Sequence, residues 1–109
     1  MRTAHHFCGT LMAANALPLA GIHQITVELA DDDGTNHTAY LVFGRSDDAA
    51  RRCRLTFDAL QLGQRYHGSA TSRSVVQGAP CHFGSVVLAV DRRRPRFAAA
   101  PVAMAGAAA

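Results

Sequence analysis

Two stretches of alternating apolar and polar residues, separated by a run of turn-forming residues, constrain the fold of this chain most strongly. In residues 22–30 every second residue from Ile25 to Leu29 is a large aliphatic one, and residues 37–43 (HTAYLVF) alternate in a similar way. A period of two is typical of β-strands that bury one face. The intervening DDDGTN is rich in residues that favour turns. The sequence therefore predicts a β-hairpin over residues 22–43.

The next segment, RSDDAARRCRLTFDALQLG, is compatible with a helix that packs on this hairpin. Ser46 can cap its N-terminus, two aspartates follow in the positively polarised first turn, and Gly63 can end it. The alternative is that CRLTFDAL forms a strand, because its apolar residues also alternate. Both interpretations of residues 46–63 stay open: one helix, or a segment that includes a strand.

The rest of the core contains runs that favour strands, QRYHGSAT, SRSVVQ and SVVLAVD, broken by glycine and proline. The expected fold class is therefore α+β: a small antiparallel sheet or a partly closed barrel of four to five strands with one helix. The number and length of the strands also allow a barrel resembling an OB-fold, although no family motif identifies one.

The length of 109 residues favours one domain. We expect residues 1–20 to be an irregular segment or a short helix and residues 21–94 to be the single domain. Residues 95–109 are Ala-rich, have no polar face to orient a helix, and are expected to be a disordered tail.

Cysteine spacing and the N-terminal segment bear on localisation. The three cysteines have no short regular spacing, unlike the framework of a disulfide-rich secreted domain, so the cytoplasm is the expected compartment. The alternative is export by a weak signal in MRTAHHFCGTLMAANALPLAG, whose apolar centre is short and interrupted, and the sequence leaves its cleavage open. No stretch is long enough to span a membrane, so no membrane association is expected.

Histidine and cysteine lie together near both ends of the chain, in HFCG and CHFG. The weak candidates for metal ligands are His6, Cys8, Cys81 and His82. Neither cluster has the spacing typical of zinc sites, and adjacent residues on a strand point to opposite faces. The sequence therefore predicts no metal site.

Catalytic patterns are also lacking. The chain has potential nucleophiles, but no nucleophile elbow, cysteine signature or phosphate-binding glycine pattern. The single glutamate, Glu28, lies on the polar face of a predicted strand without a second carboxylate placed beside it. The sequence predicts no catalytic residue, no cofactor and no enzymatic activity.

Charge is unevenly distributed along the chain. All eleven basic residues are arginine, and residues 1–50 hold two of them against six acidic residues, whereas residues 51–109 hold nine against two. Guanidinium groups bind phosphates and aromatic rings stack on bases, so a basic half with neighbouring aromatics indicates an anionic polymer as ligand. The candidate nucleic-acid-binding residues are Arg65, Tyr66, Arg73, Arg92, Arg93, Arg94 and Arg96.

Two functions follow from these observations. The first is a small non-catalytic protein-interaction or structural module, whose partner is another protein or a second copy of the chain, bound through a sheet face, an edge strand or the disordered tail. The alternative is a module that binds single-stranded nucleic acid or another anionic polymer through the arginine-rich second half. No motif identifies a ligand.

Overall fold

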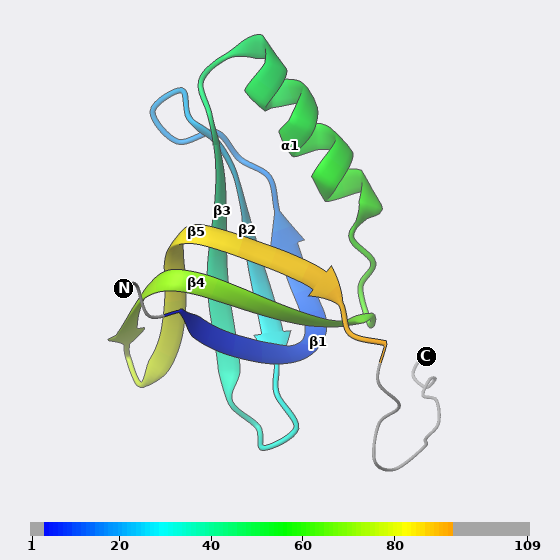
Figure 1. Ribbon diagram of the computed structural model, residues 1–109, viewed down its shortest axis with the longest axis vertical. Helices are drawn as coiled ribbons and strands as arrows, with labels where there is room; N and C mark the ends of the chain where they lie inside the picture. The colour runs from blue at the N-terminus through cyan, green and yellow to red at the C-terminus, as the bar shows by residue number, and fades with distance from the viewer. Residues whose placement is uncertain (1–3, 93–109) are drawn as a thin grey trace.

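The computed structural model describes residues 4–92, which form a five-stranded barrel with one helix (Figure 1). The elements in chain order are β1 (His5–Asn15), β2 (His23–Ala30), β3 (Asn36–Gly44), α1 (Asp47–Ala59), β4 (Arg65–Val76) and β5 (Ala79–Val90). The barrel is closed in the order β1-β2-β3-β5-β4. The predicted α+β domain is confirmed at this level.

The predicted hairpin is present as β2 and β3. The two strands pair antiparallel, with Val27 opposite Ala39 and Leu29 opposite His37. Their inward side chains make up much of the core, and Ile25, Val27 and Leu29 are fully buried. The alternation in the sequence therefore marks the inner and outer surfaces of the barrel wall.

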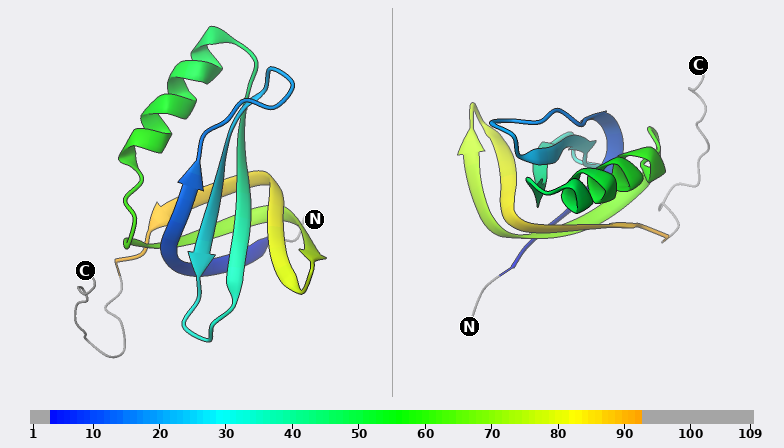
Figure 2. Two further views of the ribbon diagram at one scale, coloured as in Figure 1. Left: turned by 180° about the vertical axis from the view of Figure 1, so that it is seen from behind. Right: turned by 90° about the horizontal axis from the view of Figure 1, so that it is seen from above.

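The segment after the hairpin is a helix, so the strand alternative for CRLTFDAL is wrong. Ser46 Oγ accepts a hydrogen bond from the Ala49 backbone N–H at 3.0 Å, which is the geometry of an N-cap. The helix buries Ala49 and Cys53 and leaves Leu55 60% exposed. It packs against β2 and β3 and lies beside one end of the barrel (Figure 2).

The N-terminal segment differs from the prediction for residues 1–20, because His5–Asn15 is a strand. Residues 5–10 of β1 pair with β4 and residues 10–15 pair with β2, so β1 joins the two sides of the barrel. A register shift between Leu11 and Ala13 interrupts the period of two, which conceals the strand in the sequence. The domain therefore begins before residue 21.

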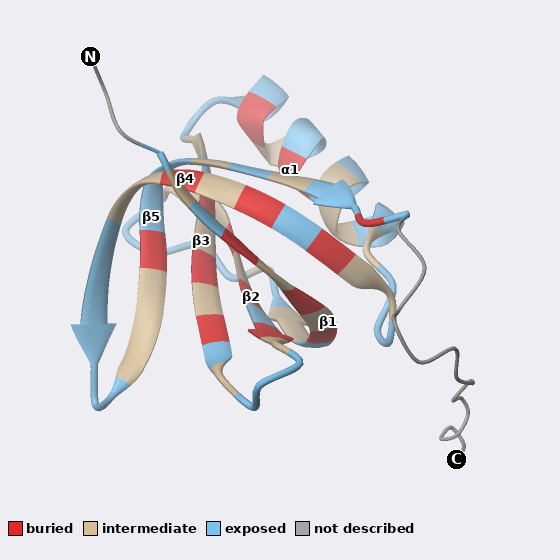
Figure 3. Cartoon of the chain, turned by 60° about the horizontal axis from the view of Figure 1, so that its bottom comes forward, coloured by how far each residue is buried: buried red, intermediate tan, exposed pale blue. Residues whose placement is uncertain are grey.

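Gly9 lies where β1 changes partner. A Cβ atom at this position would lie 2.6 Å from the backbone oxygen of Ala30. Only glycine allows the two backbones to approach so closely. The buried positions along β1 are visible in Figure 3, where they continue the core of the neighbouring strands.

Barrel closure corrects the predicted fold in two respects. The barrel is fully closed rather than partly closed, and its sheet is mixed, since β3 and β5 are parallel where Thr38 meets Cys81 and Ala39 meets His82. The last strand begins at Ala79, earlier than the SVVLAVD run suggests. The predicted tail at residues 95–109 lies outside the described residues.

Candidate functional site

Two histidines and a phenylalanine are stacked inside the barrel at the end opposite α1. The Phe7 ring lies 4.0 Å from that of His82 and 5.9 Å from that of His37, measured between centroids. His37 Nδ1 and His82 Nε2 are 3.0 Å apart, and His37 Nε2 is 3.4 Å from a carboxylate oxygen of Asp31. Strands β1, β3 and β5 each contribute one ring to this cluster.

His82 is fully buried, and its Nδ1 atom has no hydrogen-bond partner among the described residues. Burial is the main reason that the pKa of His82 is lowered to about 4, and electrostatic interactions with His37, Arg73 and His5 lower it further. His82 is therefore neutral at physiological pH. An open depression of about 830 Å³ adjoins the cluster and is lined in part by Asp31 and His37.

The acidic run between β2 and β3 is tied into the fold. Asp32 accepts hydrogen bonds from Arg65 at 2.8 and 3.3 Å, and Asp33 accepts one from the Thr35 backbone N–H at 2.9 Å. That backbone hydrogen bond is the main reason that the pKa of Asp33 is lowered. Hydrogen bonding to Asp32 likewise raises the pKa of Arg65, so the guanidinium group is held charged.

The predicted nucleic-acid residues do not form one continuous surface. Arg65 donates to Asp32 and to the buried Asp91, and Tyr66 is a core residue whose hydroxyl accepts a hydrogen bond from the Gln61 backbone N–H. Arg73 is exposed near the other end of β4, and Arg92 is exposed after β5. Arg93, Arg94 and Arg96 lie outside the described residues. Arg65 and Tyr66 thus have structural partners already.

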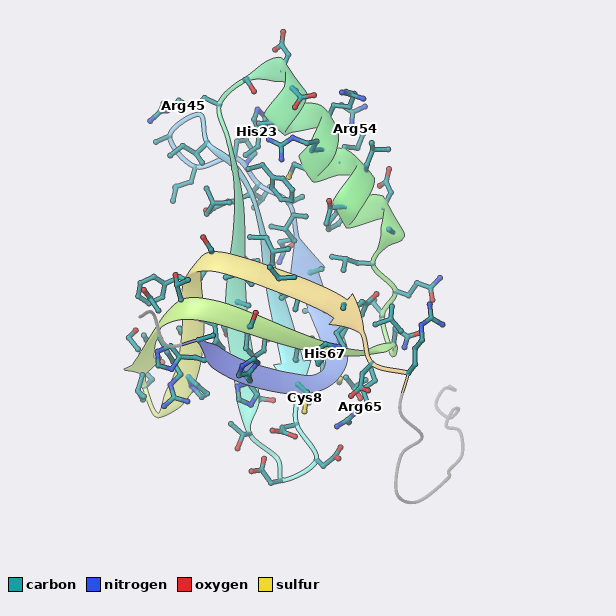
Figure 4. The ribbon with its side chains drawn as sticks, in the orientation of Figure 1. Cys8, His23, Arg45, Arg54, Arg65 and His67 are labelled. Atoms are coloured by element: carbon teal, nitrogen blue, oxygen red, sulfur yellow. The ribbon has the colours of Figure 1, made fainter. Side chains whose placement is uncertain are left out.

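The candidate metal ligands do not converge either. His6 and Cys8 lie on β1, where Cys8 is opposite His67 of β4 (Figure 4). His82, by contrast, is buried in the core. Within residues 4–92, no group of three histidine, cysteine or acidic side chains is arranged to hold a metal ion. All three cysteines are free, and burial raises the pKa of the Cys53 thiol, which keeps it protonated.

The outer face of β2 and β3 is a further candidate binding surface, which was not predicted from the sequence. Its members are the outward-pointing residues of the two strands, namely Gln24, Thr26, Glu28, Thr38, Tyr40 and Val42. Tyr40 lies near the middle of β3, opposite Thr26, and is partly exposed. The alternation of residues 37–43 already places this ring on the polar side of the hairpin, which is the signal that could have identified it.

One end of this face carries positive charge. His23 begins β2, and Arg45 follows β3 at the same end of the barrel, while Arg54 lies on α1 (Figure 4). Arg45 Nη1 donates a hydrogen bond of 2.8 Å to the Ala20 carbonyl oxygen, which holds the loop between β1 and β2. This contact places a guanidinium group at the β1–β2 loop, at the end of the barrel where β2 begins and β3 ends.

Comparisons with protein-family models, with curated proteins and with solved structures found no match. Among the described residues, no helix is long and apolar enough to cross a membrane.

Proposed function

We propose that this chain is a non-catalytic module that binds single-stranded nucleic acid on the outer face of β2 and β3. The strand order carries the proposal: a closed barrel β1-β2-β3-β5-β4 with the helix between β3 and β4 resembles the OB-fold. In that architecture the face of the second and third strands and the adjoining loops bind oligonucleotides or oligosaccharides.

The shape of the barrel supports this surface. Figure 2 shows that α1 lies beside the barrel end, so it leaves the middle of the outer face of β2 and β3 uncovered. The β1–β2 loop and the β4–β5 hairpin lie on the same side of β3 and flank this face (Figure 2). A strand of nucleic acid could therefore cross β2 and β3 between these two projections.

The chemistry of the face favours a nucleic acid over a neutral ligand. Tyr40 offers an aromatic ring for base stacking, and Thr26 and Gln24 offer hydrogen-bonding groups beside it. Arg45 supplies a positive charge for a phosphate at one end. Glu28 is the only acidic side chain on this face, so it causes little repulsion of phosphates. Because one arginine attracts them, we expect a modest affinity for nucleic acid that falls as the salt concentration is raised.

Fluorescence anisotropy with a labelled thymidine oligonucleotide at low and moderate salt tests the proposal. Stacking contributes about 1–3 kcal/mol per base, so we expect Tyr40→Ala to weaken binding roughly tenfold. Tyr40→Phe keeps the ring and should bind like the unmodified chain. Absence of binding even at low salt would refute the proposal.

The charged end of the face has a matched control in α1. We expect Arg45→Ala to weaken oligonucleotide binding several-fold and to reduce its salt dependence, because one phosphate contact is lost. Arg54→Ala removes the same charge from the helix and should leave binding unchanged. Equal losses for the two variants would show that net charge, rather than this surface, determines affinity.

A second candidate function is self-association as a protein-interaction module. The β4–β5 hairpin exposes Val75, Val76, Phe83 and Val87, which is unusual for a small monomeric domain. The edge of β4 beyond Ala70 has no described strand beside it other than β5, so a second copy could pair there.

Light scattering after size-exclusion chromatography tests self-association. We expect the apparent mass to rise with concentration and Val75→Ser with Val76→Ser to restore the monomer. Leu62→Ser, at an equally exposed leucine outside the hairpin, serves as the control and should still associate. A chain that is monomeric at every concentration would contradict this second function.

A further inference from the structure

When both rings are neutral, the hydrogen bonds of the histidine cluster allow one arrangement of protons. The Asp31 carboxylate can only accept, so the facing His37 Nε2 carries the hydrogen and His37 Nδ1 is an acceptor. His82 Nε2 must then donate to His37 Nδ1. This assignment leaves His82 Nδ1 with a bare lone pair in the core.

The bare lone pair of His82 Nδ1 can accept a proton, on a ring that is fully buried and stacked on Phe7. A positive charge that stays on this ring has no carboxylate beside it. The charged and titratable groups that face His82 are His37 from β3, Arg73 from β4 and His5 from β1, all of which are cationic when protonated. The carboxylate of Asp31 already binds His37 and does not contact His82.

We propose that Asp31, His37 and His82 form a proton-operated latch, which keeps this end of the barrel closed while both rings are neutral. Uptake of a proton by His82 would separate the stacked rings. The segments released would be the first half of β1, which is held through Phe7, and the part of the β2–β3 loop at Asp31, whereas Asp32 stays bound to Arg65. This inference is independent of the proposed nucleic-acid surface.

The topology confines the opening to one end of the molecule. Residues 5–9 of β1 pair only with β4, so fewer hydrogen bonds hold them than hold a strand with two neighbours. The depression beside His37 gives water a path to the separated rings. The cluster of Ile25, Val27 and Leu41 and the packing of α1 involve no titrating side chain of the latch.

NMR of the unmodified chain tests the latch directly. At pH 7.5 the ring-nitrogen signals should show His82 as the neutral tautomer with hydrogen on Nε2, and His37 Nε2 should also carry hydrogen. On acidification His82 should take up its proton near pH 4. Amides of residues 5–9 and 31–37 should lose protection from hydrogen exchange in the same step, while those of β2 and α1 stay protected.

The variant His82→Phe keeps an aromatic ring against Phe7 but cannot take up a proton, so its first half of β1 should stay protected at low pH. The inference is overturned if His82 titrates near pH 6.5, if its neutral form carries hydrogen on Nδ1, or if α1 and β1 lose protection together. It also fails if His82→Phe opens at the same pH as the unmodified chain. The tautomer and titration measurements need no variant, so they decide the question even if His82→Phe does not fold.

Discussion

At the scale of single residues, Gly68 shows how tightly the barrel end is packed. A Cβ atom at Gly68 would lie 2.6 Å from Phe7 Cζ and 2.8 Å from a methyl carbon of Leu88. Phe7 cannot move away easily, because its ring is stacked on His82. Position 68 in QRYHGSAT is therefore a glycine because the Phe7 ring on the neighbouring strand β1 occupies the space that a side chain would need.

We expect Gly68→Ala to lower the free energy of unfolding by about 2 kcal/mol, because overpacking of a filled core is costly. Urea denaturation measures this change. Ser69→Ala, at the next position of β4, alters a partly exposed side chain and should change stability by less than about 0.5 kcal/mol. A fully stable Gly68→Ala protein would show that Phe7 has other positions available.

His82 predicts how stability depends on pH. Its pKa is about 4 in the folded chain, whereas an unfolded histidine titrates near 6.5. Between these values the unfolded chain binds a proton that the folded chain does not, so the free energy of unfolding falls as the pH is lowered. The contribution of neutral His82 to the free energy of unfolding is complete above pH 6.5 and is lost progressively as the pH falls toward 4. The total loss is about 3 kcal/mol.

Urea denaturation at pH 7.5, 6 and 5 checks this dependence. The comparison with His82→Phe removes the contribution of the other titrating groups, which the two proteins share. We expect the unmodified chain to lose more stability between pH 7.5 and 5 than His82→Phe does. Parallel pH profiles would mean that His82 has an ordinary affinity for protons in the folded chain.

At the scale of elements, the features visible in the sequence were those with local causes. The β2–β3 hairpin shows an unbroken alternation, and α1 shows a capping serine, so both could be predicted from neighbouring residues. The strand β1 could not, because its bulge near Met12 breaks the alternation and its two halves pair with different strands. Its identity depends on contacts that are distant in the sequence.

The helix cap gives an element-scale prediction. Ser46→Ala removes the acceptor for the Ala49 backbone N–H, and we expect a loss of about 1 kcal/mol in the free energy of unfolding. Ser74→Ala changes an exposed serine of β4 and should have no measurable effect. Thermal unfolding followed by circular dichroism compares the two, and equal transition temperatures would exclude a role for the cap.

At the scale of the whole molecule, Arg65 connects three distant segments. Its guanidinium group contacts Asp32 in the β2–β3 loop, Asp91 after β5 and the Cys8 sulfur on β1. The sequence shows an excess of arginine in the second half and of acid in the first half, and this contact is one place where the two halves meet. The composition indicated an external anion, whereas the fold provides an internal one for this residue.

Replacing Arg65 should therefore destabilise the whole barrel. We expect Arg65→Met to lower the free energy of unfolding by about 2 kcal/mol, since it removes a guanidinium group that donates to the buried carboxylate of Asp91 and to Asp32. Arg51→Met removes an exposed helical ion pair with Asp48 and should cost less than about 0.5 kcal/mol. Similar losses in urea denaturation would show that the Arg65 network contributes no more than a surface pair.

The candidate site could be predicted only in part from the sequence, because it also depends on contacts between residues that are distant in the chain. Tyr40 could be placed on the outer side of a strand from alternation alone, but its neighbour Thr26 on the face belongs to β2. Tyr66 has the same local sequence signals as an exposed aromatic, yet it packs into the core. Which aromatic residue faces solvent depends on how the barrel closes.

The parallel contact between β3 and β5 has a consequence for the order of folding. The β2–β3 and β4–β5 hairpins are joined by short turns, so each can form with little loss of chain entropy. Thr38 and Cys81, by contrast, meet only after α1 and the whole of β4 have been brought into place. Thr38 and Cys81 are 43 residues apart in the sequence, and among the described strand pairs only β1 with β4, where His5 meets Ala70, joins residues that are farther apart. Closure at these two pairs therefore comes late and would set the folding rate.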